Sequence, residues 1–321
     1  LARVAPGGGT VERVIGGPRS VAAYSEGAQG PIAALISEPH LPAEVFAFDD
    51  GELRRLTHTN DALLEDLLFG EVENVHFASR DGTEIQGFIV KPPNFDPELR
   101  YPTILHIHGG PQAQYDFAFN FEAQLFAANG YVVTLPNPRG STGYGQDFCY
   151  AIWQDWGGID LEDVLASVDD AIERGYADPE RLGVGGWSYG GMMTNHVITK
   201  SDRFKGAYTG ASATLYVVNY GHDHYQRWWE AELGVPWRHR ELWEKLSPFN
   251  RVEDVVTPTL IVGGEHDWNV PIINSEQLYM ALKSLGKTTE LVVYPGEGHV
   301  FETPSYNKDL YERVLAWFGK Y

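Results

Sequence analysis

A serine flanked by glycines carries the sharpest chemical signal in the sequence. Residues 186–191 read Gly-Trp-Ser-Tyr-Gly-Gly, which fits the pattern Gly-x-Ser-x-Gly around Ser188. A serine on a tight turn between a strand and a helix projects its hydroxyl above the sheet, and the glycines let neighbouring backbone approach closely. The pattern alone is common in loops, but here the strand-like run 181–185 precedes it and the helical run 189–199 follows. We therefore predict that Ser188 is a nucleophile.

A serine hydroxyl is a weak nucleophile and needs a base, which the C-terminal part of the sequence supplies. His299 follows the strand-like run 290–294 in a glycine-rich turn, and Asp267 follows the apolar run 260–262. We expect the serine to attack, the histidine to take and return the proton, and the aspartate to orient the imidazole. Glu265 is a competing acid, but Asp267 is favoured because it lies farther beyond the strand.

A third motif offers donors for a developing oxyanion. Residues 106–111 read His-Ile-His-Gly-Gly-Pro at the end of a strand-like run. The backbone amides of Gly110 and Tyr189 are predicted to form a hole with two donors. His106 and His108 share a strand face, but no third ligand lies near them in the sequence, so a metal site is disfavoured. We expect neither a metal nor a cofactor.

The elements that must position these groups alternate between strands and helices from Val72 onward. Strand-like runs occur at 103–108, 131–135, 181–185, 204–209, 260–262 and 290–294, and helical runs at 121–128, 161–174, 189–199, 274–285 and 308–318. Such alternation predicts an α/β protein with a doubly wound, mostly parallel sheet that is covered on both faces. The carboxyl ends of parallel strands meet at one edge, so the three motifs are expected to converge there.

The first 71 residues follow a different pattern. Short β-type runs at 20–25, 31–37, 43–48 and 52–58 are separated by turn residues that include Asp50-Gly51, a strong hairpin signal. Four short antiparallel strands at this spacing resemble one blade of a β-propeller, although an ordinary meander has the same pattern. A lone blade cannot bury both faces, so it either docks on the C-terminal remainder of the chain or lacks its neighbours. We expect a blade-like segment at 1–71 and a catalytic domain at 72–321.

Composition argues against several classes of partner. The 321 residues include 44 Asp and Glu but 24 Lys and Arg, so the net charge is −20, which disfavours nucleic acid and anionic membrane surfaces. Cys149 is the one cysteine, so no intrachain disulfide can form. The sequence lacks an apolar run long enough to cross a membrane and begins without the apolar core of a signal peptide. We expect a cytoplasmic protein whose chain is a processed or partial product.

The motifs together resemble those of the prolyl oligopeptidase family of serine peptidases, and the acylaminoacyl peptidases are the most similar branch. The stretches that carry this resemblance are 108–111, 137–145, 157–163, 186–191, 267–271 and 294–299. In that family an α/β-hydrolase domain follows a β-propeller that gates the access of peptides. The resemblance implies a triad of Ser188, Asp267 and His299, with Gly110 and Tyr189 at the oxyanion positions. It also implies that residues 1–71 resemble the last blade of the propeller and that the remaining blades are missing from this chain or separate from it.

The resemblance also implies a substrate site. Asn269 matches a position that touches the substrate backbone in some relatives. The pocket for the side chain before the scissile bond (P1) should draw on Tyr216, Trp228, Trp229 and Val270. The expected partners are peptides, and a homo-oligomer is compatible with the sequence.

The leading hypothesis is a serine peptidase that acts through an acyl-enzyme and releases N-terminal residues, blocked by an acyl group. A dipeptidyl peptidase or aminopeptidase of the same family is an alternative that would need acidic residues to bind a free amine. A carboxylesterase or lipase on the same fold is another alternative, which would need no propeller. A binding protein without activity is expected to lack a triad member, and all three are present.

Overall fold

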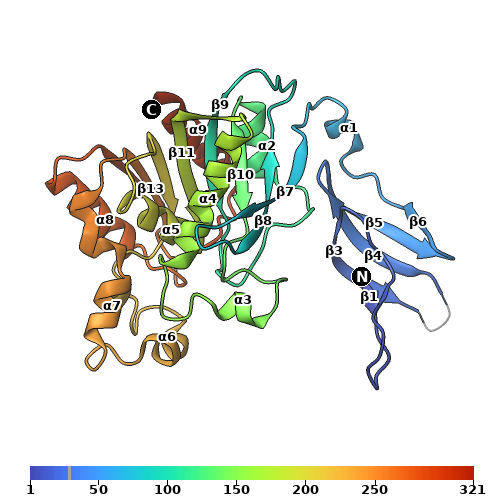
Figure 1. The fold of residues 1–321 in the computed structure, drawn as a ribbon, viewed down its shortest axis with the longest axis horizontal. Coiled ribbons are helices and arrows are strands. Elements are labelled where there is room, and N and C mark those ends of the chain that lie inside the picture. Colours follow the sequence, from blue (N-terminus) through green and yellow to red (C-terminus); the bar gives the residue numbers. More distant parts are fainter. Residues whose placement is uncertain (28–29) are drawn as a thin grey trace.

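The computed structural model describes residues 1–27 and 30–321, and a mixed eight-stranded sheet forms its centre (Figure 1). The strand order is β14-β13-β12-β11-β9-β10-β8-β7. The strands are β7 (Val72–Ala78), β8 (Glu84–Val90), β9 (Tyr101–Ile107), β10 (Val132–Pro136), β11 (Ala177–Trp187), β12 (Gly206–Gly210), β13 (Thr259–Gly264) and β14 (Thr289–Tyr294). All pairings from β14 across to β10 are parallel, whereas β8 is antiparallel to both β7 and β10.

Helices cover both faces of this sheet. One face packs against α2 (Phe121–Ala128) and α9 (Pro304–Lys320), and the other against α4 (Ile159–Glu173), α5 (Tyr189–Ile198) and α8 (Ile273–Ser284). Successive strand residues point to opposite faces, so Ile104 packs in the first layer and Leu105 in the second, and both are wholly buried. The predicted doubly wound α/β-hydrolase fold is therefore confirmed. Among the helices of the described ranges, none combines the length and apolar character needed to cross a membrane.

A long insertion between β12 and β13 was not assigned to helices from the sequence. It contains η1 (Tyr216–Val218), α6 (Gln226–Leu233), α7 (Arg240–Leu246) and η2 (Pro248–Asp254). Its aromatic side chains form a separate buried cluster with Trp156, which lies in the loop before α4. Two further short helices, α1 (Asp61–Leu64) and α3 (Gln146–Tyr150), lie in other connections. The insertion matters for function because its cluster borders the candidate site.

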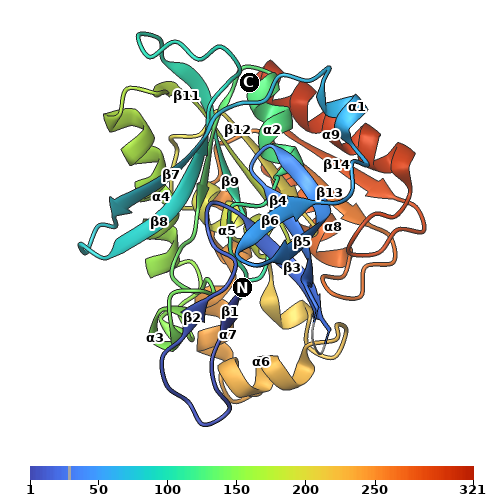
Figure 2. The same ribbon diagram turned by 90° about the vertical axis from the view of Figure 1, so that its right-hand side faces the viewer.

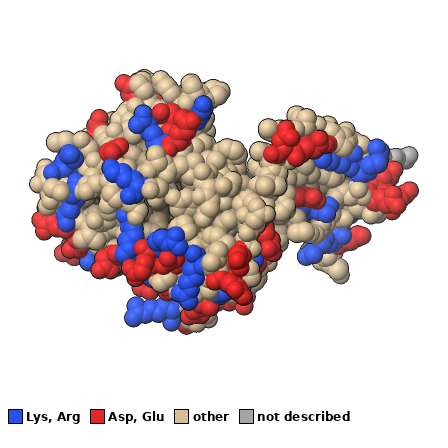
Figure 3. Space-filling view, turned by 90° about the horizontal axis from the view of Figure 1, so that it is seen from above, with Lys and Arg blue, Asp and Glu red and all other residues tan. Residues whose placement is uncertain are grey.

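The N-terminal residues form a smaller sheet beside the larger one (Figures 1 and 2). The four predicted strands are present as an antiparallel meander of β3 (Ser20–Glu26), β4 (Ile32–Glu38), β5 (Leu41–Asp49) and β6 (Glu52–Arg55), and a hairpin of β1 (Ala2–Arg3) and β2 (Glu12–Arg13) precedes them. One side of the meander buries Ala34, Ile36 and Phe46 together with Ile15. Figure 3 shows this part as a lobe that projects from the larger body.

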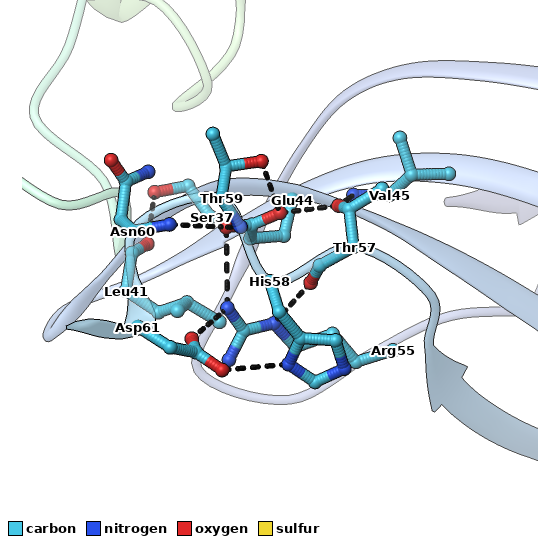
Figure 4. Close-up of polar contacts among 10 residues, drawn as sticks. All are labelled: Ser37, Leu41, Glu44, Val45, Arg55, Thr57, His58, Thr59, Asn60 and Asp61. Carbon is cyan, nitrogen blue, oxygen red and sulfur yellow. Dashed lines mark hydrogen bonds and ion pairs between the residues drawn. The ribbon is translucent and has the colours of Figure 1, made fainter.

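A buried carboxylate fixes the end of the smaller sheet (Figure 4). The Glu44 side chain accepts hydrogen bonds from the hydroxyl of Thr57, from the amides of Thr59 (2.9 Å) and Asn60 (3.4 Å), and from Arg55 (3.2 Å). A buried charge needs such partners, and the bond from Thr57 is the main reason that the pKa of Glu44 lies below its usual value. The network therefore ties β5 and β6 to the segment that leads into α1.

The smaller sheet contacts the larger part through a loop that follows β9. The Ser20 hydroxyl donates to Asp116 Oδ2 at 2.6 Å, and the amide of Phe119 donates to Ser37 Oγ at 2.9 Å. His40 stacks on Phe69, with ring centroids 5.8 Å apart. The loop that follows the His-Gly-Gly-Pro motif is therefore held from the N-terminal side as well as by the central sheet.

Candidate active site

Ser188 lies on a strained turn between β11 and α5. Its backbone has φ 60° and ψ −121°, a conformation that costs a residue other than glycine about 1–3 kcal/mol. A Cβ atom on Gly190 would lie 2.0 Å from the carbonyl oxygen of Ile107, and one on Gly186 would lie 2.5 Å from the same atom. Both positions around the serine therefore require glycine, and the local structure is the strand, turn and helix that the sequence predicts.

The candidate base and acid are joined by a hydrogen bond. His299 Nδ1, in the loop after β14, lies 2.7 Å from Asp267 Oδ2, in the loop after β13. The other carboxylate oxygen accepts the amides of Asn269 and Val270, each at 2.8 Å. An ionised carboxylate only accepts hydrogen bonds, so Nδ1 carries the proton and Nε2 is left as the proton acceptor.

The competing carboxylates have other partners. Glu265 Oε2 accepts the amide of Gly296 at 2.9 Å. Glu297 accepts the amides of Glu302 (2.7 Å) and Thr303 (3.3 Å). In the described part of the chain neither of these two glutamates bonds to the histidine, so the geometry favours Asp267 as the acid.

The serine and the histidine lie at the same edge of the sheet. The indole of Trp187, the residue before the serine, donates to the carbonyl oxygen of His299 at 2.9 Å. Over the described residues, however, no hydrogen bond joins Ser188 to His299. Catalytic hydrogen bonds are often long in unliganded enzymes and tighten when substrate binds, so this arrangement is compatible with a nucleophile and its base.

The glycine-rich loop after β9 lies beside the serine. A Cβ atom on Gly109 would lie 3.6 Å from the Ser188 Cβ, and Gly110 has φ +132°, which favours glycine. The imidazole of His108 bonds to the carbonyl of Gly109 at 2.7 Å and to Ser141 Oγ at 3.0 Å. Burial lowers the pKa of His108 to about 4, so this ring is neutral and holds the loop with both nitrogens.

Tyr189, the other candidate oxyanion residue, begins α5. The first amides of a helix have no acceptor within that helix, so its N–H group remains available above the serine turn. The side chain points the other way and is buried, and its hydroxyl donates to Asp160 Oδ2 at 2.7 Å. Burial raises the pKa of Asp160 to about 7. This hydrogen bond therefore fixes the serine turn to α4, in which Asp160 lies.

A cavity of about 330 Å³ opens at the serine. Of the predicted residues, its lining includes Gly110, Ser188, Trp228, Trp229, Asn269 and Val270. The residues that sequence reasoning missed are Pro111, Gln112, Trp156, Met192, Ala213, Asn219 and Tyr225. None of these lining residues is charged. Within the described ranges no cluster of three or more His, Cys, Asp or Glu side chains could hold a metal ion.

The expectation that Tyr216 lines the pocket is wrong. Its side chain is wholly buried behind the cavity wall, with its ring 5.7 Å from that of Trp229, and its hydroxyl bonds to His196 Nε2 at 3.1 Å. Trp156 lines the cavity instead and packs 4.9 Å from Trp228. The sequence signal for Trp156 was its place directly before the Gly-Gly stretch at 157–158.

Comparisons with known proteins find related sequences over most of the chain. A model described as the prolyl oligopeptidase family matches residues 117–321. The uncharacterized peptidase YuxL of Bacillus subtilis is 37% identical over 296 residues, which are 90% of this chain and 45% of that protein. A probable dipeptidyl-peptidase 5 of Emericella nidulans is 31% identical over 276 residues, which are 82% of this chain and 37% of that protein.

Among solved structures, the acylaminoacyl peptidase of Pyrococcus horikoshii superposes with a TM-score of 0.90 at 29% identity. The superposition covers 97% of this chain and 51% of that one. The chain therefore spans about half the length, or less, of the relatives that it matches.

Proposed function

Because the chain belongs to the prolyl oligopeptidase family, we propose that it is a serine peptidase that cleaves peptides through an acyl-enzyme on Ser188. The observation that carries this proposal is the bond from His299 to Asp267 at the sheet edge where the strained serine turn lies. A histidine held in this way presents Nε2 as a base, which a serine hydroxyl needs in order to attack.

The proposed reaction has two steps. Ser188 Oγ attacks the scissile carbonyl while His299 Nε2 accepts its proton, and the protonated imidazole then gives that proton to the leaving amine. The negative charge on the former carbonyl oxygen is stabilised by the amides of Gly110 and Tyr189, a contribution for which one lost donor typically costs ~10²–10³ in rate. Water then attacks the ester with the same histidine as base, which releases the acid and restores the serine.

The proposed substrates are short peptides with a blocked N-terminus and an uncharged P1 side chain. The absence of charged groups from the cavity lining supports this choice, because a buried charge without a partner is strongly disfavoured. The structural similarity to an acylaminoacyl peptidase supports it further. Release of dipeptides with a free amine is the second candidate, and the similarity to a probable dipeptidyl-peptidase 5 favours it.

We propose that residues 1–71 are a blade of a β-propeller and that residues 72–321 are the catalytic domain. The four-stranded meander supports this division, as does the fact that the chain spans about half the length of its relatives. The remaining blades would then lie on a longer or separate chain and limit the size of peptides that reach the site. A cytoplasmic location and a homo-oligomer belong to the same proposal.

The test combines covalent labelling with turnover. A fluorophosphonate probe should label the wild-type protein and leave Ser188→Ala unlabelled, while circular dichroism and the melting temperature of the two proteins agree. An N-acetyl-aminoacyl anilide should be cleaved with a higher kcat/KM than the same anilide with a free amine. The reverse preference would favour the dipeptidyl peptidase or aminopeptidase alternative. Fast hydrolysis of esters with neither anilide cleaved would favour an esterase.

A further inference from the structure

One polar side chain lies deep in the wall of an otherwise aromatic and apolar cavity. Asn219 follows η1 and lines the cavity, yet it is only 1% exposed. The other amide side chains of the lining, Gln112 and Asn269, are exposed and half-buried respectively. Of these three amides, Asn219 is therefore the one best placed to meet the far end of a bound P1 side chain.

The orientation of the Asn219 amide follows from its neighbour in α8. Asn274 Oδ1 accepts the amide of Thr214 at 3.2 Å, so Asn274 must turn its Nδ2 group the other way. That Nδ2 group donates to the carbonyl of Pro271 at 3.0 Å and to Asn219 Oδ1 at 2.9 Å. Asn219 is thereby forced to present its oxygen to Asn274, which leaves its own Nδ2 group for another partner.

That Nδ2 group has no acceptor among residues 1–27 and 30–321, although it is buried. Buried donors in proteins are almost always satisfied, and those that are not often have a functional reason. His196 Nδ1 also lacks a hydrogen-bond partner among the described residues. It lies behind the pocket and beside Gly157, so it does not compete for a ligand in the cavity. Asn219 combines an unused donor with a place in the cavity wall.

We propose that Asn219 determines P1 specificity by donating a hydrogen bond to an acceptor at the tip of the P1 side chain. The inference rests on the proposed peptidase function and deepens it. Rings of Trp156, Trp228 and Trp229 border the same cavity and provide walls against which an aromatic side chain packs favourably. A tyrosine side chain supplies both the ring and a terminal oxygen, so the preferred P1 residue is tyrosine over phenylalanine.

The test compares N-acetyl-Tyr and N-acetyl-Phe p-nitroanilides, which differ by one hydroxyl. The wild-type protein should favour tyrosine by about tenfold in kcat/KM, the size expected for one neutral hydrogen bond. Asn219→Leu removes the donor and keeps the same number of side-chain heavy atoms, branched at Cγ. In this variant the ratio should fall to one or below, because only the tyrosine substrate loses a hydrogen bond.

Other outcomes overturn the inference. A purely structural role for Asn219 would lower both rates together and leave the ratio unchanged. If the ratio falls to one in Gln112→Leu but is unchanged in Asn219→Leu, the hydrogen bond to the P1 side chain comes from Gln112 at the mouth of the cavity and not from Asn219. The wild-type ratio alone remains decisive if Asn219→Leu does not fold: equal rates on both substrates reject the inference and leave the peptidase function intact. No cleavage of either anilide would instead reject the proposed function.

Discussion

Replacing Asp267 by asparagine tests whether the acid sets the tautomer of the histidine. One oxygen of Asp267 accepts the two amides of Asn269 and Val270, and these donors would orient the new side chain with its oxygen toward them. The NH₂ group would then face His299 Nδ1, where the carboxylate oxygen now lies 2.7 Å away. Two donors cannot share one hydrogen bond, so the imidazole must place its proton on Nε2 and loses its ability to accept the serine proton.

The expected loss is about 10⁴ in kcat/KM, or about 5 kcal/mol of transition-state stabilisation, because a base in the wrong tautomer is absent from the reaction. The assay is turnover of an N-acetyl-aminoacyl p-nitroanilide, with the melting temperature as the check on folding. Glu265→Gln is the matched control. Glu265 accepts the amide of Gly296 and, over the described residues, does not bond to the histidine, so its variant should retain activity within about threefold. A loss below ~10² in Asp267→Asn with intact folding would refute the reasoning.

Three further substitutions test the scaffold. Burial raises the pKa of Asp160 to about 7, so its contribution to stability is complete below about pH 4 and is lost as the pH rises to 7. Asp160→Asn should therefore gain stability relative to wild type between pH 5 and pH 7.5 in urea unfolding, and a constant difference would contradict this. Gly190→Ala places a Cβ 2.0 Å from the Ile107 carbonyl oxygen and should abolish probe labelling, whereas Gly319→Ala meets open space and should not. Glu44→Ala should speed hydrogen exchange in β5 and β6 without change in β11, and equal protection would show that the network is dispensable.

The central sheet could be predicted because both of its faces are buried. Adjacent residues such as Ile104 and Leu105 pack in different layers, so each inner strand appears in the sequence as an apolar run with turn residues at its ends, whereas the edge strands β7 and β14 keep some exposed residues. The nucleophile turn and the histidine turn follow such runs directly. Their positions along the chain therefore fixed their positions at the sheet edge once the strands were assigned.

The residues that line the cavity could not be predicted as fully as the strands of the sheet. The walls of the cavity come from short helices whose burial depends on tertiary contacts, and α6, which carries Trp228 and Trp229, is too short at 8 residues for its period to stand out in the sequence. Sequence reasoning placed Tyr216 in the lining, but the ring lies one layer behind, where Trp156 from another connection covers it. The choice between Asp267 and Glu265 also depended on loop geometry that no periodicity encodes.

The candidate triad and the oxyanion residue Gly110 are held by different parts of the chain. The serine, acid and histidine all lie within the matched range 117–321. The indole of Trp187 links the serine turn to His299, and His299 in turn bonds to Asp267. Gly110 lies before that range, in a loop that the smaller sheet contacts through Ser20 and Ser37. A disturbance of the N-terminal sheet would therefore act first on the oxyanion amide and leave the base and its acid in place. Such a change lowers kcat rather than the reactivity of the histidine, because the amide stabilises charge that develops only in the transition state.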